Sequence, residues 1–139
     1  MATEKPPARV ELRWQHELVF TGTAGGVGMT VDSAAVEGPS PMQTLAFALT
    51  GCMAMDLVHI LQKGRHQFSA IDAQLTGRRS PEDPKRFTEV DLHFRITGTV
   101  AEAVVQRAID LSREKYCSVW HSMRQDITLD VTFTVDPAP

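Results

Sequence analysis

The chain has two cysteines, Cys52 and Cys117, which are far apart in the sequence and form no CxxC pair. A thiol serves both as a nucleophile and as a redox group, but only the fold could make these two partners. Gly51 removes side-chain bulk beside Cys52, and Cys117 lies at a predicted helix junction, where free backbone N–H groups stabilise a thiolate. Free cysteine is also among the most commonly buried residue types. Their positions therefore fit either a reaction centre or two inert core residues.

Two polar residues follow Cys52 on roughly the same face of a predicted helix. Asp56 comes one turn later and His59 comes seven residues later. Because a negative charge raises the pKa of a nearby thiol, we expect Asp56 to organise the site, either by accepting hydrogen bonds or by pairing with a basic group, rather than to activate the sulfur directly. His59 is a candidate base or a hydrogen-bond partner of Asp56. The compact Cys-His spacing of a structural zinc site is missing, so we expect no metal and no bound cofactor.

The helix that carries Cys52 is predicted to be long and buried. Ser40 and Pro41 supply an N-cap and a first helical residue, and the run rich in Ala, Leu and Met that follows ends at Lys63 and Gly64. Nearly every side chain from 45 to 61 is apolar or small, so this helix lacks a wide solvated face. A sheet or a second subunit must cover it, and a second subunit is the easier cover for so small a protein.

Strands and two further helical segments surround this helix. Apolar and polar residues alternate, or β-formers gather, in segments 10–20, 29–34, 68–77, 87–98 and 127–135. The glycine-rich segment 25–28 predicts a hairpin turn, and the apolar spacing predicts an amphipathic helix over 101–116, followed by a short helical segment over 118–124. The predicted fold class is α+β, in the order β-β-α-β-β-α-β. We expect one domain over 1–139, with a flexible lead-in over 1–9.

Composition excludes several partners. The 139 residues are 42% hydrophobic and 22% charged, and the net charge is −3. The absence of a basic stretch makes nucleic acid an unlikely partner, so none is expected. The first residues lack the apolar run of a signal peptide, which predicts a cytoplasmic protein. The longest apolar run, 45–61, contains Asp56 and His59 and is shorter than the roughly 20 residues that cross a bilayer, so no membrane is expected.

Two segments resemble the paired cysteine motifs of the OsmC/Ohr family. The first is SPMQTL at 40–45 running into LTGC at 49–52, and the second is EKYCSV at 114–119. The resemblance covers roughly 10–135. It implies an OsmC-like α+β fold in which two chains intertwine as a homodimer, with the cysteine helices at the centre. It also implies thiol-dependent reduction of hydroperoxides, an oxidoreductase activity that serves peroxide stress defence.

On this chain the resemblance makes Cys52 the attacking cysteine and Cys117 the resolving one. Cys52 would become a sulfenic acid, Cys117 would condense with it to a disulfide, and an external dithiol would restore both thiols. The best-characterised members add an arginine and a glutamate, where this chain has Val27 and Met42. Gln43 is then a candidate hydrogen-bonding group beside the missing carboxylate. The candidates for the missing positive charge are Arg9, Arg13, Arg78, Arg79 and Arg124.

Two other functions stay open at this point. A non-catalytic dimer of the same fold could hold a small apolar or thiol-reactive ligand in its interface pocket. A hot-dog-type thioesterase could use Asp56 or His59 as its base, although the second helix and its cysteine count against that fold.

Overall fold

The computed structural model describes residues 3–138, which form two compact units with their boundary between Leu45 and Ala46. Residues 1, 2 and 139, which belong to the predicted domain, lie outside the described residues. Residues 3–10 of the N-terminal segment form no helix or strand. The prediction of one domain over 1–139 stays a prediction.

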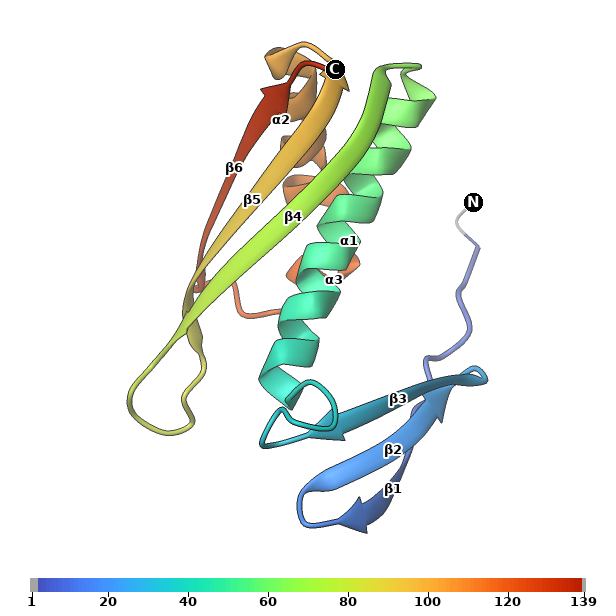
Figure 1. The fold of residues 1–139 in the computed structure, drawn as a ribbon, viewed down its shortest axis with the longest axis vertical. Coiled ribbons are helices and arrows are strands. Elements are labelled where there is room, and N and C mark those ends of the chain that lie inside the picture. The colour runs from blue at the N-terminus through green and yellow to red at the C-terminus, as the bar shows by residue number, and fades with distance from the viewer. Residues whose placement is uncertain (1–2, 139) are drawn as a thin grey trace. The chain divides into compact units, whose positions relative to one another are not determined.

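The first unit contains an antiparallel sheet of three strands, β1 (Glu11–His16), β2 (Val19–Ala24) and β3 (Val27–Asp32) (Figure 1). The glycine-rich hairpin turn is confirmed, since Gly25 and Gly26 take φ values of 56° and 84° between β2 and β3. The prediction of one continuous strand over 10–20 is wrong. Glu17 takes a left-handed φ of 46°, and its carbonyl oxygen accepts a 2.8 Å hydrogen bond from the Trp14 indole N–H. This turn divides the segment into β1 and β2.

Helix α1 (Pro41–Lys63) begins and ends where the sequence predicts. Its start is a reciprocal capping box, in which the Gln43 N–H donates to Ser40 Oγ at 3.1 Å and the Ser40 N–H donates to Gln43 Oε1 at 3.0 Å. By length and composition alone α1 is able to cross a membrane. However, one side of it is an apolar row of buried side chains at a spacing of four residues: Leu49, Met53, Leu57 and Leu61.

Within a single chain α1 is buried on one side only, so the predicted cover of its other sides by a second subunit stays a prediction. Outside that row, its side chains are exposed or half-buried, and Phe47 and Met55 are 69% and 72% exposed. The physical reason is that one chain covers only one face of the helix. The remaining apolar surface faces outward.

The second unit contains a sheet in the order β4 (Gln67–Arg79), β5 (Phe87–Thr99) and β6 (Thr128–Asp136). The predicted hairpin is confirmed, because β4 and β5 pair antiparallel across the loop 80–86. Strand β6 lies on the other side of β5 and pairs with it in parallel. A parallel pair needs a crossover connection, and the helical segments between β5 and β6 provide it.

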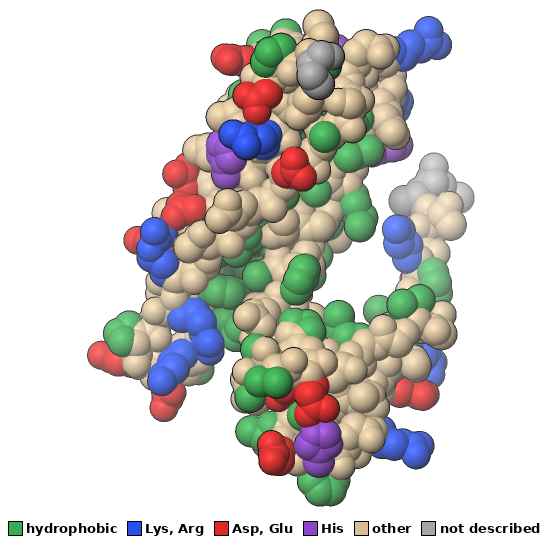
Figure 2. All heavy atoms as spheres, in the orientation of Figure 1, with side chains coloured by type: hydrophobic (Ala, Val, Ile, Leu, Met, Phe, Trp, Pro, Cys, Tyr) green, Lys and Arg blue, Asp and Glu red, His purple; other side chains and the backbone are tan. Residues whose placement is uncertain are grey.

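The core of this unit lies on one face of the sheet. The four apolar β5 residues predicted to share a face are all buried: Val90, Leu92, Phe94 and Ile96. Helices α1 and α2 (Glu102–Leu111) lie on the same side of the sheet (Figure 1). The other face is polar, with ion pairs such as Arg95–Asp136 at 3.0 Å, and acidic and basic side chains are spread over it in Figure 2. The second unit is thus a layer of helices packed on a layer of sheet.

The segment that leads to Cys117 differs from its prediction. The expected helix over 101–116 is α-helical only as α2, and its last part is a π-helical turn, η1 (Ser112–Tyr116). This turn closes where the Cys117 N–H donates to the Ser112 carbonyl oxygen at 2.7 Å, a bond that spans five residues. The expected helix over 118–124 is shorter, α3 (Ser118–His121). A π turn adds a residue to the helical repeat, which rotates the following residue by about 100° relative to a continued α-helix.

Candidate functional site

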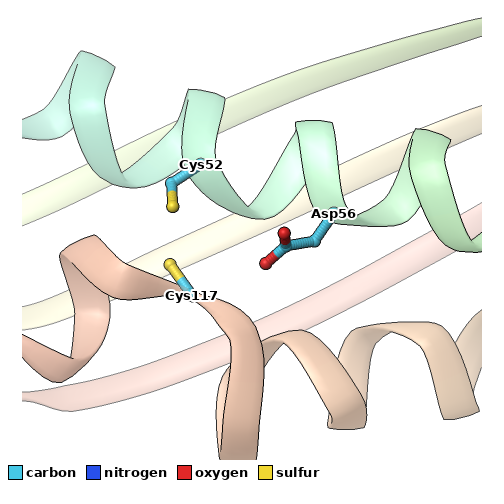
Figure 3. Close-up of side chains that lie close together, drawn as sticks. All are labelled: Cys52, Asp56 and Cys117. Atoms are coloured by element: carbon cyan, nitrogen blue, oxygen red, sulfur yellow. The ribbon is translucent and has the colours of Figure 1, made fainter. Parts of the chain in front are cut away.

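The structure brings the two cysteines and Asp56 together. The sulfurs of Cys52 and Cys117 and a carboxylate oxygen of Asp56 all lie within 4.8 Å of one another. Cys52 and Asp56 come from successive turns of α1, whereas Cys117 comes from the junction of η1 and α3. The two sulfurs point toward each other and the Asp56 carboxylate points toward Cys117 (Figure 3). The sulfurs of Cys52 and Cys117, whose separation could not be predicted from the residues, therefore lie close together.

Hydrogen bonds to residues before and after Cys117 in the sequence fix its position. Its side chain is 0% exposed, and its backbone N–H is bound to Ser112. It is also the N-cap of α3, because its sulfur accepts a hydrogen bond from the Trp120 N–H at 3.4 Å. The predicted location at a helix junction is confirmed.

A buried serine fixes the carboxylate of the cluster. Ser112 Oγ donates to Asp56 Oδ2 at 2.8 Å, and Ser112 is 1% exposed. This agrees with the expectation that Asp56 accepts hydrogen bonds. Ser112 was missed by sequence reasoning, because a serine within a predicted amphipathic helix gives no sign of this contact. Its backbone N–H donates to the Ala108 and Ile109 carbonyl oxygens, so Ser112 continues the path of α2.

The surroundings of Cys117 keep its thiol protonated. Burial raises the pKa of Cys117 to about 11, and the neighbouring Cys52 sulfur and Asp56 charge act in the same direction, against the hydrogen bond from the Trp120 N–H. Cys52, by contrast, is partly exposed. Of the two cysteines, Cys52 is the less buried and is therefore the better candidate to meet a dissolved reagent.

This pKa has a consequence for stability at high pH. The folded pKa of about 11 lies above the ordinary value of 9.0, so the folded state holds a proton that the unfolded state releases between these values. We expect the free energy of unfolding to fall from pH 9 through pH 11, by at most about 2–3 kcal/mol from this group. Urea denaturation of the reduced protein at pH 8–11 measures it, with Cys117→Ala as the matched control. Equal pH slopes for the two proteins would contradict the assignment.

His59 lies outside the sulfur cluster and beside a cavity. The cavity has a volume of about 540 Å³ and is lined by Asp56, His59, Ile60, Lys63, Gly64, Leu111 and Tyr116. Asp56 belongs to both the cavity wall and the sulfur cluster. His59 and Lys63 make one end of this cavity basic.

Other candidate residues are engaged elsewhere. The amide oxygen of Gln43 is used in the capping box of α1, which gives Gln43 a structural role. Arg78 pairs with Asp91 at 2.6 Å, and Arg124 pairs with Asp126 at 2.6 Å.

The remaining three candidate arginines lie in different settings. Arg79 donates to the Lys85 carbonyl oxygen at 2.6 Å. Arg9 is an exposed residue of the first unit, as is Arg13. Among the described residues, the causes that shift the Cys117 pKa include no basic side chain.

Comparison with known proteins places these residues in a family context. The family pattern described as OsmC-like protein matches residues 31–132. Protein YhfA of Escherichia coli strain K12 is 38% identical over 130 residues, which cover 91% of this chain and 97% of that protein. A hypothetical protein from Aquifex aeolicus VF5 has a similar structure, with a TM-score of 0.89, 28% identity, and coverage of 97% of this chain and 100% of that one.

A more distant structural neighbour is a protein named for a function. It is the organic hydroperoxide resistance protein OsmC, predicted redox protein, of Legionella pneumophila, with a TM-score of 0.71, 12% identity, and coverage of 95% of this chain and 99% of that one. At this identity the likeness concerns the fold alone. Together the matches confirm the α+β fold that the resemblance implied and make the hot-dog alternative wrong.

Proposed function

Because the chain belongs to the OsmC-like protein family, we propose that it is a thiol-dependent peroxidase that reduces organic hydroperoxides through Cys52 and Cys117. The observation that supports this proposal is the pair of sulfurs within 4.8 Å, which belong to a half-buried and a buried cysteine. The less buried cysteine suits the attack, and the buried thiol beside it suits the resolving step. The Legionella pneumophila protein is named for resistance to the same class of substrate.

In the first step, the Cys52 thiolate attacks the O–O bond of the hydroperoxide. Cys52 becomes a sulfenic acid, and the leaving alkoxide takes a proton to become the alcohol. In the second step, the Cys117 sulfur attacks the Cys52 sulfur, and the sulfenic hydroxyl leaves as water with the Cys117 proton. An external dithiol then supplies two electrons and two protons to restore both thiols.

Asp56 and Ser112 act in this mechanism as positioning residues. The hydrogen bond between them holds the carboxylate against the sulfurs. The disulfide needs the sulfurs to approach to about 2.05 Å, so the second step moves at least one cysteine. In place of the family's arginine, Arg9 and Arg13 stay the candidates for a positive charge.

We also propose that the protein is a homodimer that pairs through the outer stripe of α1. This stripe is defined by Phe47, Gly51, Ala54, Met55 and Val58, which follow one another at helical spacing. A shallow groove of about 330 Å³ lies along most of it, and hydrophobic side chains are visible over α1 in Figure 2. Around Gly51, an added Cβ would meet only the tip of Met55, at 4.0 Å, so a second backbone has room to approach. Burying this stripe would remove exposed apolar area from water.

Cellular context stays a prediction. We propose a cytoplasmic protein in peroxide stress defence, with a small hydroperoxide and a dithiol as its reaction partners and with no nucleic acid or membrane partner.

Mass spectrometry of the intact protein tests the proposed reaction. One equivalent of cumene hydroperoxide added to the reduced protein is expected to remove two hydrogens per chain, because both thiols end as one disulfide. Peptide mapping should locate a link between Cys52 and Cys117. An unchanged mass, or stable addition of oxygen to one sulfur, would contradict the mechanism. An unchanged mass together with binding of an unreacted peroxide would favour the non-catalytic ligand-binding alternative.

A further inference from the structure

We propose that the reduced cluster of Cys52, Asp56 and Cys117 is also a Zn²⁺ site. Two sulfurs and a carboxylate oxygen within 4.8 Å of one another are three ligand atoms of the kinds that zinc prefers. They come from two separate elements, α1 and the junction of η1 and α3, and they converge on one point (Figure 3). Sequence spacing could not reveal this set, because the second thiol arrives from another part of the chain.

The geometry needs only a small contraction to bind the ion. Zinc lies about 2.3 Å from a thiolate sulfur and about 2.0–2.2 Å from a carboxylate oxygen, so tetrahedral ligand atoms are about 3.4–3.8 Å apart. The observed separations of at most 4.8 Å exceed these values by no more than about 1.0–1.4 Å. Forming the disulfide requires a larger approach.

The neighbouring groups also suit a metal ion. The bond from Ser112 Oγ to Asp56 Oδ2 at 2.8 Å orients the carboxylate from outside the cluster, as second-layer hydrogen bonds do in zinc proteins. Asp56 also lines the 540 Å³ cavity, which offers room for a water molecule as fourth ligand and a route of entry. Two thiolates and one carboxylate carry three negative charges against the two positive charges of the ion. Because zinc is bound by thiolates rather than by thiols, binding releases the two thiol protons to solvent.

One consequence rests on the proposed peroxidase function. Zinc and hydroperoxide need the same Cys52 sulfur, so bound zinc is expected to slow the reaction. A hydroperoxide that oxidises the metal-bound thiolates would take two electrons from them and, with two protons, become an alcohol and water. The resulting disulfide no longer offers thiolate ligands, and the Zn²⁺ leaves.

Isothermal titration of the reduced, metal-free protein with Zn²⁺ tests the site without any peroxide. We expect one ion per chain. Co²⁺ as a spectroscopic probe should show thiolate charge-transfer bands and the visible bands of a tetrahedral ion. Cys52→Ser and Cys117→Ser should each abolish these cobalt bands. The side chain of Asp56→Asn can still accept the hydrogen bond from Ser112, yet this variant should bind zinc at least about tenfold more weakly, and Ser112→Ala about 10- to 100-fold more weakly.

Glu89→Gln is the matched control, because Glu89 is an exposed carboxylate on β5, and its zinc affinity should be unchanged. Wild-type protein that binds no zinc, or Asp56→Asn protein that binds it as tightly as wild type while its circular dichroism is native, would overturn the site. Protein that binds zinc through these residues but leaves hydroperoxide untouched would support the metal site and overturn the peroxidase function. Protein that reduces hydroperoxide but binds no zinc would overturn the metal site alone.

Discussion

Cys52→Ser is expected to lower the rate of hydroperoxide reduction by more than about 10³-fold, the scale on which loss of a covalent nucleophile lowers kcat. Cys52 is the less buried cysteine of the pair, and a serine hydroxyl is not a nucleophile toward peroxide at neutral pH. The measurement is hydroperoxide consumption in the presence of a dithiol. Serine is close to cysteine in size, so the fold should persist and circular dichroism should be native.

Cys117→Ser is the informative partner of that variant. It keeps the attacking sulfur, so one equivalent of hydroperoxide per chain should still be consumed rapidly. The sulfenic acid then has no thiol beside it and should accumulate, where dimedone can trap it. The reverse pattern, with activity retained in Cys52→Ser and the first reaction lost in Cys117→Ser, would show that the roles of the two cysteines are exchanged.

The parts of the fold that the sequence could predict are those specified by neighbouring residues. The start of helix α1 could be predicted from Ser40 and Pro41 because capping is local, and in the structure Ser40 caps the helix reciprocally with Gln43. The buried face of β5 was predicted because its apolar side chains alternate with polar ones. The break at Glu17 was not predicted, because Glu17 and Leu18 are not typical turn residues. The turn is instead supported by a hydrogen bond from the Trp14 indole N–H. The parallel direction of β6 depends on its partner strand, which periodicity does not identify.

In the candidate site, too, the features specified by neighbouring residues could be predicted and those that depend on packing could not. The relation of Cys52 to Asp56 could be predicted because four residues make about one helical turn. The approach of Cys117 followed only from the family resemblance, since no local pattern connects it to α1. The π turn that places Cys117, and the bond from Ser112 to Asp56, depend on packing between the two helices. A sequence without that packing would give no reason to prefer η1 over a continued α-helix.

The outer stripe of α1 gives the second large expected effect. Met55→Arg should weaken the proposed dimer by about 3–5 kcal/mol, because it buries a charge without a partner at the centre of the stripe. This corresponds to a rise in the dissociation constant of between about 10²- and 5 × 10³-fold. In a twofold dimer the substituted side chain occurs on both sides of the interface, and the expected loss of about 3–5 kcal/mol is for both copies together. Sedimentation equilibrium over a range of concentrations measures the constant.

Ala103→Arg is the matched control, since it adds the same charge to an exposed residue of α2 and should leave the dissociation constant unchanged. Met55 is 72% exposed in one chain, so arginine there should cost the monomer little stability. Loss of the dimer with native circular dichroism would therefore be an interface effect rather than an unfolding effect. A wild-type protein that is monomeric at every concentration, or a Met55→Arg protein that dimerises as tightly as wild type, would contradict pairing through this stripe. In either case the apolar surface of α1 would require a different cover.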